Sequence, residues 1–227
     1  MPDLPLADVK RRASELSGEK TKITLNDVVM TVLSKTLHDY LREYTDDKTT
    51  EYIKIACPFS LRPQPETVGG FVFDNNFSII LVNLKLVDSL EKGCAEISKD
   101  MAALKKSMHP IATYYLNTIV NLLPDFIRAY IHEDVAQKIT LGFSNVPGPR
   151  EAYVMAGKKN NALGFIMPLS RSVVGSCSVI SHAGVMKIGL SMDKAVMEST
   201  KPMRDIFIKN LDEMLGKEWR STQGNEV

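Results

Sequence analysis

Residues 139–148 constrain this chain more than any other stretch, because two incompatible signals meet within them. The first half is a short apolar run with β-branched residues, which is typical of a buried strand. The second half contains Pro147, which has no N–H to give to a ladder, and then a Gly-Pro step. We therefore predict a central strand that enters a bent loop and brings Ser144 and Asn145 to the strand's end. A polar pair there is a common ligand-binding feature of α/β proteins, although a loop that bonds its own backbone fits equally well.

The strongest helix signal follows Thr24, which has the features of an N-cap. Asp27 stands at the third helical position, where it would complete a capping box. Apolar residues then recur at helical spacing up to residue 44. We predict a helix about 30 Å long at about 1.5 Å per residue, with its Val28, Val32 and Leu33 side against a sheet.

The remaining pattern alternates helices with strands and then turns to hairpins. We expect helices over residues 8–17, 88–107, 110–131 with a break near Pro124, and 200–215. Strands are expected over residues 52–59, 77–86, 153–156, 162–169, 173–180 and 185–190, with turns at Gly157 and Ala183-Gly184. Residues 77–86 are too uniformly apolar for an exposed face. The pattern predicts an α/β fold, a mixed sheet backed by helices.

Composition narrows the function classes. The net charge of +1 and the pI of about 7.7 give no field that would attract nucleic acid, and we expect no nucleic-acid partner. Three cysteines lie far apart and are expected to be reduced and buried, as in an intracellular protein. We find no signal peptide and no apolar run long enough for a membrane span. Residues 114–131 are apolar on most sides, which fits a core helix or a contact with a membrane surface or an apolar tunnel.

Sequence signatures of common catalytic sites are absent. There is no G-x-S-x-G, G-x-x-x-x-G-K-[ST], G-x-G-x-x-G or H-E-x-x-H. The four histidines lie on separate elements without ligand spacing, so we expect no metal site. Cys177 stands inside a predicted strand, where we expect a small buried thiol rather than a nucleophile. Asn26-Asp27 opens the best helix, where local capping and presentation of an amide to a ligand are both compatible with the position.

Several segments together resemble the C-terminal half of the bacterial-type wax ester synthase/diacylglycerol acyltransferase family. The resemblance extends over residues 4–215, in the family's order. The specific motif is Ser-Asn-Val-Pro-Gly-Pro at residues 144–149, and the second is Asn-Asp-Val-Val at residues 26–29. Further matching segments are residues 6–10, 58–62, 76–77 and 189–193.

The resemblance implies one α/β lobe of a chloramphenicol acetyltransferase-like, CoA-dependent acyltransferase fold. The implied reaction moves an acyl group from acyl-CoA to a long-chain alcohol or diacylglycerol, with acyl-CoA as substrate and no cofactor. Its general base is a histidine in an H-H-x-x-x-D-G motif of the N-terminal lobe. This sequence lacks that motif, so we assign no catalytic residue and no metal here. The resemblance makes Asn26, Asp27, Ser144 and Asn145 substrate-binding or site-supporting residues.

These inferences leave the biological context open. We expect residues 1–217 to form the C-terminal lobe, with a catalytic N-terminal lobe supplied in cis or in trans, and residues 218–227 to be a disordered polar tail. A non-catalytic truncated paralogue that binds lipid or a partner, and a fragment of a longer enzyme, are the alternatives. The expected location is cytoplasmic, with peripheral contact at a membrane or lipid droplet as an open alternative. A lone lobe should expose an apolar face beside Ser144 or along residues 114–131.

Overall fold

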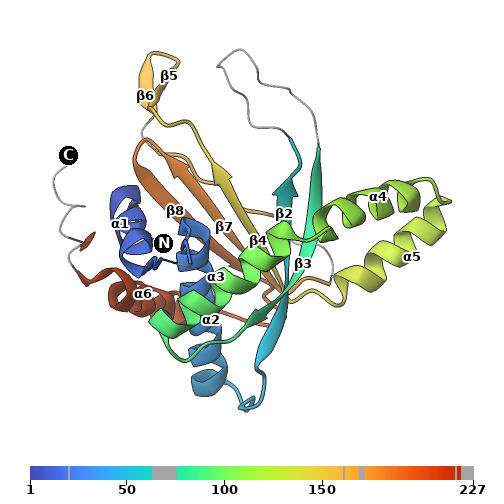
Figure 1. The fold of residues 1–227 in the computed structure, drawn as a ribbon, viewed down its shortest axis with the longest axis horizontal. Coiled ribbons are helices and arrows are strands. Elements are labelled where there is room, and N and C mark those ends of the chain that lie inside the picture. Colours follow the sequence, from blue (N-terminus) through green and yellow to red (C-terminus); the bar gives the residue numbers. More distant parts are fainter. Residues whose placement is uncertain (20, 63–75, 161, 169–171, 218, 221–227) are drawn as a thin grey trace.

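The fold is built on one six-stranded mixed sheet with the strand order β1-β8-β7-β4-β2-β3 (Figure 1). The computed structural model describes residues 1–19, 21–62, 76–160, 162–168, 172–217 and 219–220. The strands of the sheet are β1 (Leu4–Pro5), β2 (Tyr52–Ser60), β3 (Phe77–Lys85), β4 (Leu141–Pro147), β7 (Gly175–His182) and β8 (Val185–Met192). Neighbours β2, β4 and β7 run parallel to one another. Strand β3 pairs antiparallel with β2, β8 pairs antiparallel with β7, and β1 pairs antiparallel with β8. A separate hairpin consists of β5 (Tyr153–Met155) and β6 (Lys158–Asn160).

Four helices cover one face of the sheet: α1 (Leu6–Leu16), α2 (Leu25–Tyr44), α3 (Leu90–Lys106) and α6 (Lys201–Leu215) (Figure 1). Their apolar sides and the facing strand residues share one hydrophobic core. The other two helices, α4 (His109–Asn121) and α5 (Asp125–Ala136), extend beyond the β3 edge as a helical hairpin. Pro124 separates them, as predicted. The predicted mixed sheet backed by helices is confirmed.

Helix α2 forms as its sequence predicts. Thr24 and Asp27 make a capping box, in which Asp27 Oδ2 accepts from the Thr24 N–H at 2.8 Å. Val28, Val32 and Leu33 are buried in the core that the helices share with the sheet. Periodicity and local capping thus determine this element together.

Both short hairpins turn where the sequence places the turn. Ala183 and Gly184 have φ of 48° and 81°, and Ala156 and Gly157 have φ of 50° and 77°. Positive φ at both central residues gives a turn whose twist matches that of the flanking strands.

Residues 162–168 do not form the predicted strand. They lie across the face of the sheet opposite the helix layer, where Ser178 Oγ donates to the Phe165 carbonyl at 2.8 Å. Ser176 Oγ donates in the same way to the Met167 carbonyl at 3.2 Å. The backbone carbonyls are therefore satisfied by side chains that project from the sheet, and no strand edge is needed. Residue 169, the last of the predicted strand, and residues 170–171, where we expect a turn from the sequence, lie outside the described residues.

Two predictions about burial are wrong. Residues 77–86 were expected to be buried on both faces, but β3 is the edge strand and leaves Phe77 and Ile79 exposed. Trp219, assigned to a polar tail, is buried, and its indole N–H donates to Asp212 Oδ1 at 3.1 Å. A large aromatic side chain gains too much from burial to remain in solvent. Residues 221–227 of that tail lie outside the described residues.

Candidate functional site

Strand β4 continues through the motif that was expected to bend. It pairs with β7 from Leu141 as far as Pro147, whereas its pairing with β2 ends at Gly142. The Gly148 N–H donates to the Ser181 carbonyl at 2.8 Å, on the β7 side. Because successive residues of a strand point their backbone groups to opposite sides, Pro147 faces the side that β2 has left. The missing N–H therefore interrupts no ladder, and the predicted bend after Phe143 is wrong.

The strand geometry sends Ser144 and Asn145 to opposite faces of the sheet. The Asn145 side chain faces the helix layer, and its Nδ2 donates to Oδ1 of Asn26 in the first turn of α2. Ser144 shares the other face with Gly142, which closely approaches the Met167 side chain. The structure thus brings together Asn26 and Asn145 but leaves Ser144 on the far face.

Asn26 and Asn145 line a small pocket between the helix layer and the sheet, about 70 Å³ in volume. The rest of its wall is mainly apolar: Met30, Cys57, Pro58, Phe59, Ile80, Val82, Met101, Leu104 and Phe143, with Lys105 as the one charged lining residue among those described. Ligand pockets usually measure about 300–1,000 Å³, so this pocket by itself is too small for a long acyl chain. It can serve as one wall of a larger apolar channel.

The sequence reasoning missed Cys57 and Phe143 as lining residues. The apolar alternation of β2 was a usable signal for Cys57, because Ile53, Ile55 and Cys57 share the face that packs on the helices. Burial raises the pKa of the Cys57 thiol to about 12, and burial raises that of Cys177 to about 12 as well. Both thiols are therefore neutral at physiological pH, and the prediction that Cys177 is a small buried thiol is confirmed.

Asp27 is placed by capping and is not among the residues that line this pocket. Its Oδ2 accepts from the Thr24 N–H and hydroxyl, both at 2.8 Å. The other oxygen, Oδ1, is buried and has no hydrogen-bond partner among the described residues. Of the two interpretations of Asn26-Asp27, Asp27 fits local capping and Asn26 reaches toward the pocket.

His182 lies on the sheet face opposite Asn145. Its Nδ1 is 2.9 Å from the Pro149 carbonyl oxygen and its Nε2 is 3.1 Å from that of Asn160. The ring thereby connects the end of the β4 motif to the β5–β6 hairpin. No histidine lines the pocket, and no group of three metal-ligating side chains occurs in the part of the chain that the structure describes.

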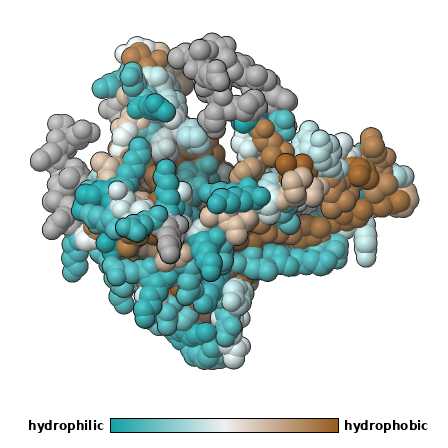
Figure 2. All heavy atoms as spheres, in the orientation of Figure 1, coloured by the Kyte–Doolittle hydropathy of each residue, from teal (hydrophilic) through white to brown (hydrophobic). Residues whose placement is uncertain are grey.

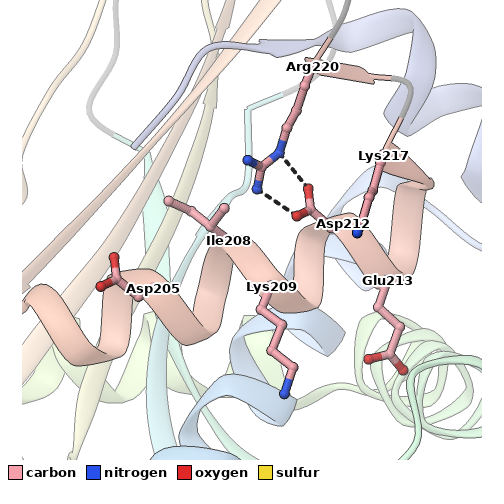
Figure 3. Close-up of a pocket in the computed structure, with 7 residues that line it drawn as sticks. All are labelled: Asp205, Ile208, Lys209, Asp212, Glu213, Lys217 and Arg220. Atoms are coloured by element: carbon pink, nitrogen blue, oxygen red, sulfur yellow. Dashed lines mark hydrogen bonds and ion pairs between the residues drawn. The ribbon is translucent and has the colours of Figure 1, made fainter.

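A larger hollow of about 520 Å³ lies along α6, but its chemistry does not suit an acyl chain (Figure 3). Asp212 is held there by Arg220, whose guanidinium donates to both carboxylate oxygens at 2.8 and 2.6 Å. Charged side chains of both signs form most of the remaining lining. The small pocket at Asn26 and Asn145 is therefore the better candidate for binding an apolar substrate.

Comparison with known proteins identifies the family. A profile of the WS/DGAT C-terminal domain matches residues 73–215. The chain belongs to this family. The residues of β4 that line the small pocket, Phe143 and Asn145, lie within the region that the WS/DGAT C-terminal domain profile matches.

The curated proteins that this chain resembles are named as diacylglycerol O-acyltransferases. The chain is similar to a Mycobacterium tuberculosis protein named Probable diacylglycerol O-acyltransferase Tgs4, with 27% identity over 166 residues. A Mycobacterium bovis counterpart matches equally. These alignments cover 68% of this chain and 31% of the relatives, so the chain spans about a third of the length of the curated proteins it matches.

Solved structures share the fold of this WS/DGAT C-terminal domain. The wax ester synthase/diacylglycerol acyltransferase from Marinobacter aquaeolei aligns with a TM-score of 0.62 at 18% identity, over 94% of this chain and 47% of the other. The trichothecene 15-O-acetyltransferase from Fusarium sporotrichioides gives 0.60 at 13% identity, over 94% and 45%. An epimerization domain of tyrocidine synthetase B gives 0.56 at 14%, over 94% and 46%. The chain thus shares the fold of about half of each of these proteins, and the predicted fold class is confirmed.

Proposed function

We propose that this domain is the C-terminal lobe of an O-acyltransferase that transfers an acyl group from acyl-CoA to a long-chain alcohol or diacylglycerol. The supporting observation is that the two motifs of the sequence resemblance meet through Asn26 and Asn145, 119 residues apart, at one mainly apolar pocket. Acyl-CoA enters as a substrate, and the reaction as proposed needs no cofactor. The amides of Asn26 and Asn145 would orient the reacting groups or the facing lobe, without moving a proton.

Acyl transfer needs a base close to the attacking hydroxyl, within about 3 Å. Taking the proton lets the alcohol oxygen attack the thioester carbonyl, and the CoA thiolate then leaves. Among the residues that the structure describes, none that lines the pocket is a histidine or a carboxylate. We therefore propose that the base comes from an N-terminal lobe with an H-H-x-x-x-D-G motif, in cis or in trans.

The second lobe would dock where β4 ends. Val146, Val154 and Met155 are exposed there and on the β5–β6 hairpin, and Ile166 is exposed on the segment that crosses the same sheet face. His182 holds this hairpin to the β4 motif through two carbonyl groups. These exposed side chains support an apolar inter-lobe surface at the end of β4. Ser144 would support that surface from beneath.

We place the protein in the cytoplasm, at the surface of a membrane or lipid droplet. Cys57, Cys94 and Cys177 are free thiols, as is usual in a reducing compartment. Long-chain alcohols and diacylglycerol are water-insoluble, so an enzyme that uses them must meet a lipid phase. In the described residues, no helix is both long and apolar enough to span a bilayer.

The second candidate is a non-catalytic protein of the same family that binds lipid or a partner. The observation that favours it is the absence of H-H-x-x-x-D-G from this sequence, together with a pocket that no histidine lines. Under this alternative, the chain would bind a family N-terminal lobe or a lipid without restoring acyl transfer.

The test is reconstitution of acyl transfer from a long-chain acyl-CoA to hexadecanol or diacylglycerol. We expect no turnover from the purified chain and measurable turnover after co-expression with a family N-terminal lobe that carries the motif. Asn145→Ala should then lower turnover more than His182→Ala does, because only Asn145 lines the pocket. Activity of the chain alone, abolished by His182→Ala, would contradict the proposal, and binding without turnover would favour the second candidate.

A further inference from the structure

The α4–α5 hairpin exposes large apolar side chains over most of its length. Tyr115, Leu116 and Ile119 on α4 are exposed, and so are Phe126 and Tyr130 on α5. Exposure is greatest at the turn between the helices, where Leu122 is 82% exposed and Phe126 75%. Figure 2 shows the hairpin, at the right of the view, as a mainly apolar projection from the body of the molecule. The interpretation of residues 114–131 as a core helix is therefore wrong, and the expected apolar face along them is confirmed.

The apolar surface is free of charge where it is most exposed on α4. Residues 107–124 contain no Asp, Glu, Lys or Arg. At the tip, Asp125 and Arg128 neutralise each other at 2.7 Å. Other charges stand near the base of the hairpin: Lys105 and Lys106 end α3, and Lys138 pairs with Asp134 at 2.5 Å. The hairpin thus has an apolar outer part and a charged rim, and Tyr115 on α4 and Tyr130 on α5 are exposed.

Helix length decides how such a hairpin could meet lipid. With 13 residues, α4 extends about 20 Å, whereas the hydrocarbon core of a bilayer is about 30 Å thick. The helix cannot cross a bilayer, but an apolar face with tyrosines and flanking lysines suits the interface, where rings and ammonium groups meet the head groups.

We infer that the outer part of the α4–α5 hairpin inserts into the interfacial layer of a lipid bilayer or lipid droplet. The inference rests on the proposed function, because a lipid acceptor must be taken from such a phase. The absence of charged residues from 107–124 favours lipid, and the exposed Lys105 and Lys106 at the rim complement phosphate head groups. The hairpin is also separate from the apolar surface of Val146, Val154 and Ile166 that we assign to the second lobe (Figure 1). Both surfaces can therefore be occupied at once.

The test measures partition of the purified full chain onto phosphatidylcholine vesicles by flotation, without acyl-CoA or an N-terminal lobe. The tip variant combines Leu122→Ser with Phe126→Ser, and the matched control combines Val154→Ser with Met155→Ser on the β5–β6 hairpin. All four side chains are more than half exposed, so neither pair should lower the melting temperature appreciably. We expect the tip variant to reduce partition by about tenfold or more and the control to retain it.

A reporter at the tip separates lipid from other occupants. Trp219 is buried, so a tryptophan introduced by Leu122→Trp should dominate any change in emission. A blue shift on adding vesicles supports insertion. A shift that depends only on protein concentration, or on addition of an N-terminal lobe, would assign the hairpin to a protein interface and overturn the inference. Equal partition of tip variant and control would also overturn it. Because no turnover is measured, these outcomes do not depend on the proposed reaction.

Discussion

At the scale of residues, the candidate pocket is lined by two asparagines, Asn26 and Asn145, whose side chains contact each other. Asn26 was predictable as a helix-start residue and Asn145 as a motif residue, yet their contact joins positions 119 apart. The orientation of Ser144 was missed because Pro147 predicted a loop. Only an uninterrupted strand alternates its side chains between faces. Pro147 is tolerated in β4 because its missing N–H faces the side where β2 no longer pairs. The strand therefore continues, and its alternation turns Asn145 toward the pocket and Ser144 away from it.

The Asn26–Asn145 contact can be measured with a double-mutant cycle in urea unfolding. Asn26→Ala and Asn145→Ala should each lower the free energy of unfolding by about 1 kcal/mol, the usual net contribution of a hydrogen bond. The double variant should lose less than the sum, with a coupling of about 0.5–1 kcal/mol. As a control, Asn160 bonds Tyr153 instead, and Asn160→Ala should be additive with Asn26→Ala. Full additivity of Asn26→Ala and Asn145→Ala would mean that their amides do not interact.

At the scale of elements, local signals sufficed wherever an element's own periodicity and caps agreed. The α2 capping box, the break at Pro124 and the Ala-Gly turns were all readable, because each depends on neighbours in sequence. The exposure of apolar side chains could not be predicted from the sequence. The apolar residues of β3 and of α4 resemble core residues, and only the sheet order and the position of the hairpin show that they face outward. Hydrophobicity predicts that a surface is covered, but not by what.

The burial of α2 leads to a prediction about Val32. Because this side chain is fully buried, Val32→Asp should place an unpaired charge in the core and cost at least about 3 kcal/mol of unfolding free energy. Val196→Asp is the same substitution at an exposed site and should change stability by less than about 0.5 kcal/mol. Chemical denaturation of both variants tests the difference. Equal small losses would show that α2 does not pack against the core.

At the scale of the whole molecule, the described structure leaves two apolar surfaces uncovered, and they lie on different elements. One lies at the end of β4, on the β5–β6 hairpin and at Ile166, and the other lies on the α4–α5 hairpin. The domain does not need to bury these surfaces to have a core, since α1, α2, α3 and α6 already cover one face of the sheet. Two separate surfaces indicate two separate occupants.

This separation predicts opposite effects for two pairs of substitutions. Val154→Asp with Ile166→Asp should abolish co-purification with a family N-terminal lobe and leave vesicle binding intact, since both residues are exposed at the proposed inter-lobe surface. Ile119→Asp with Leu122→Asp should abolish vesicle binding and leave co-purification intact, since Ile119 is exposed on α4 and Leu122 at the turn that follows it. Each pair should also reduce self-association in sedimentation, because an uncovered apolar surface promotes it. If either pair removed both interactions, the two surfaces would form one binding region, and the assignment of separate occupants would be wrong.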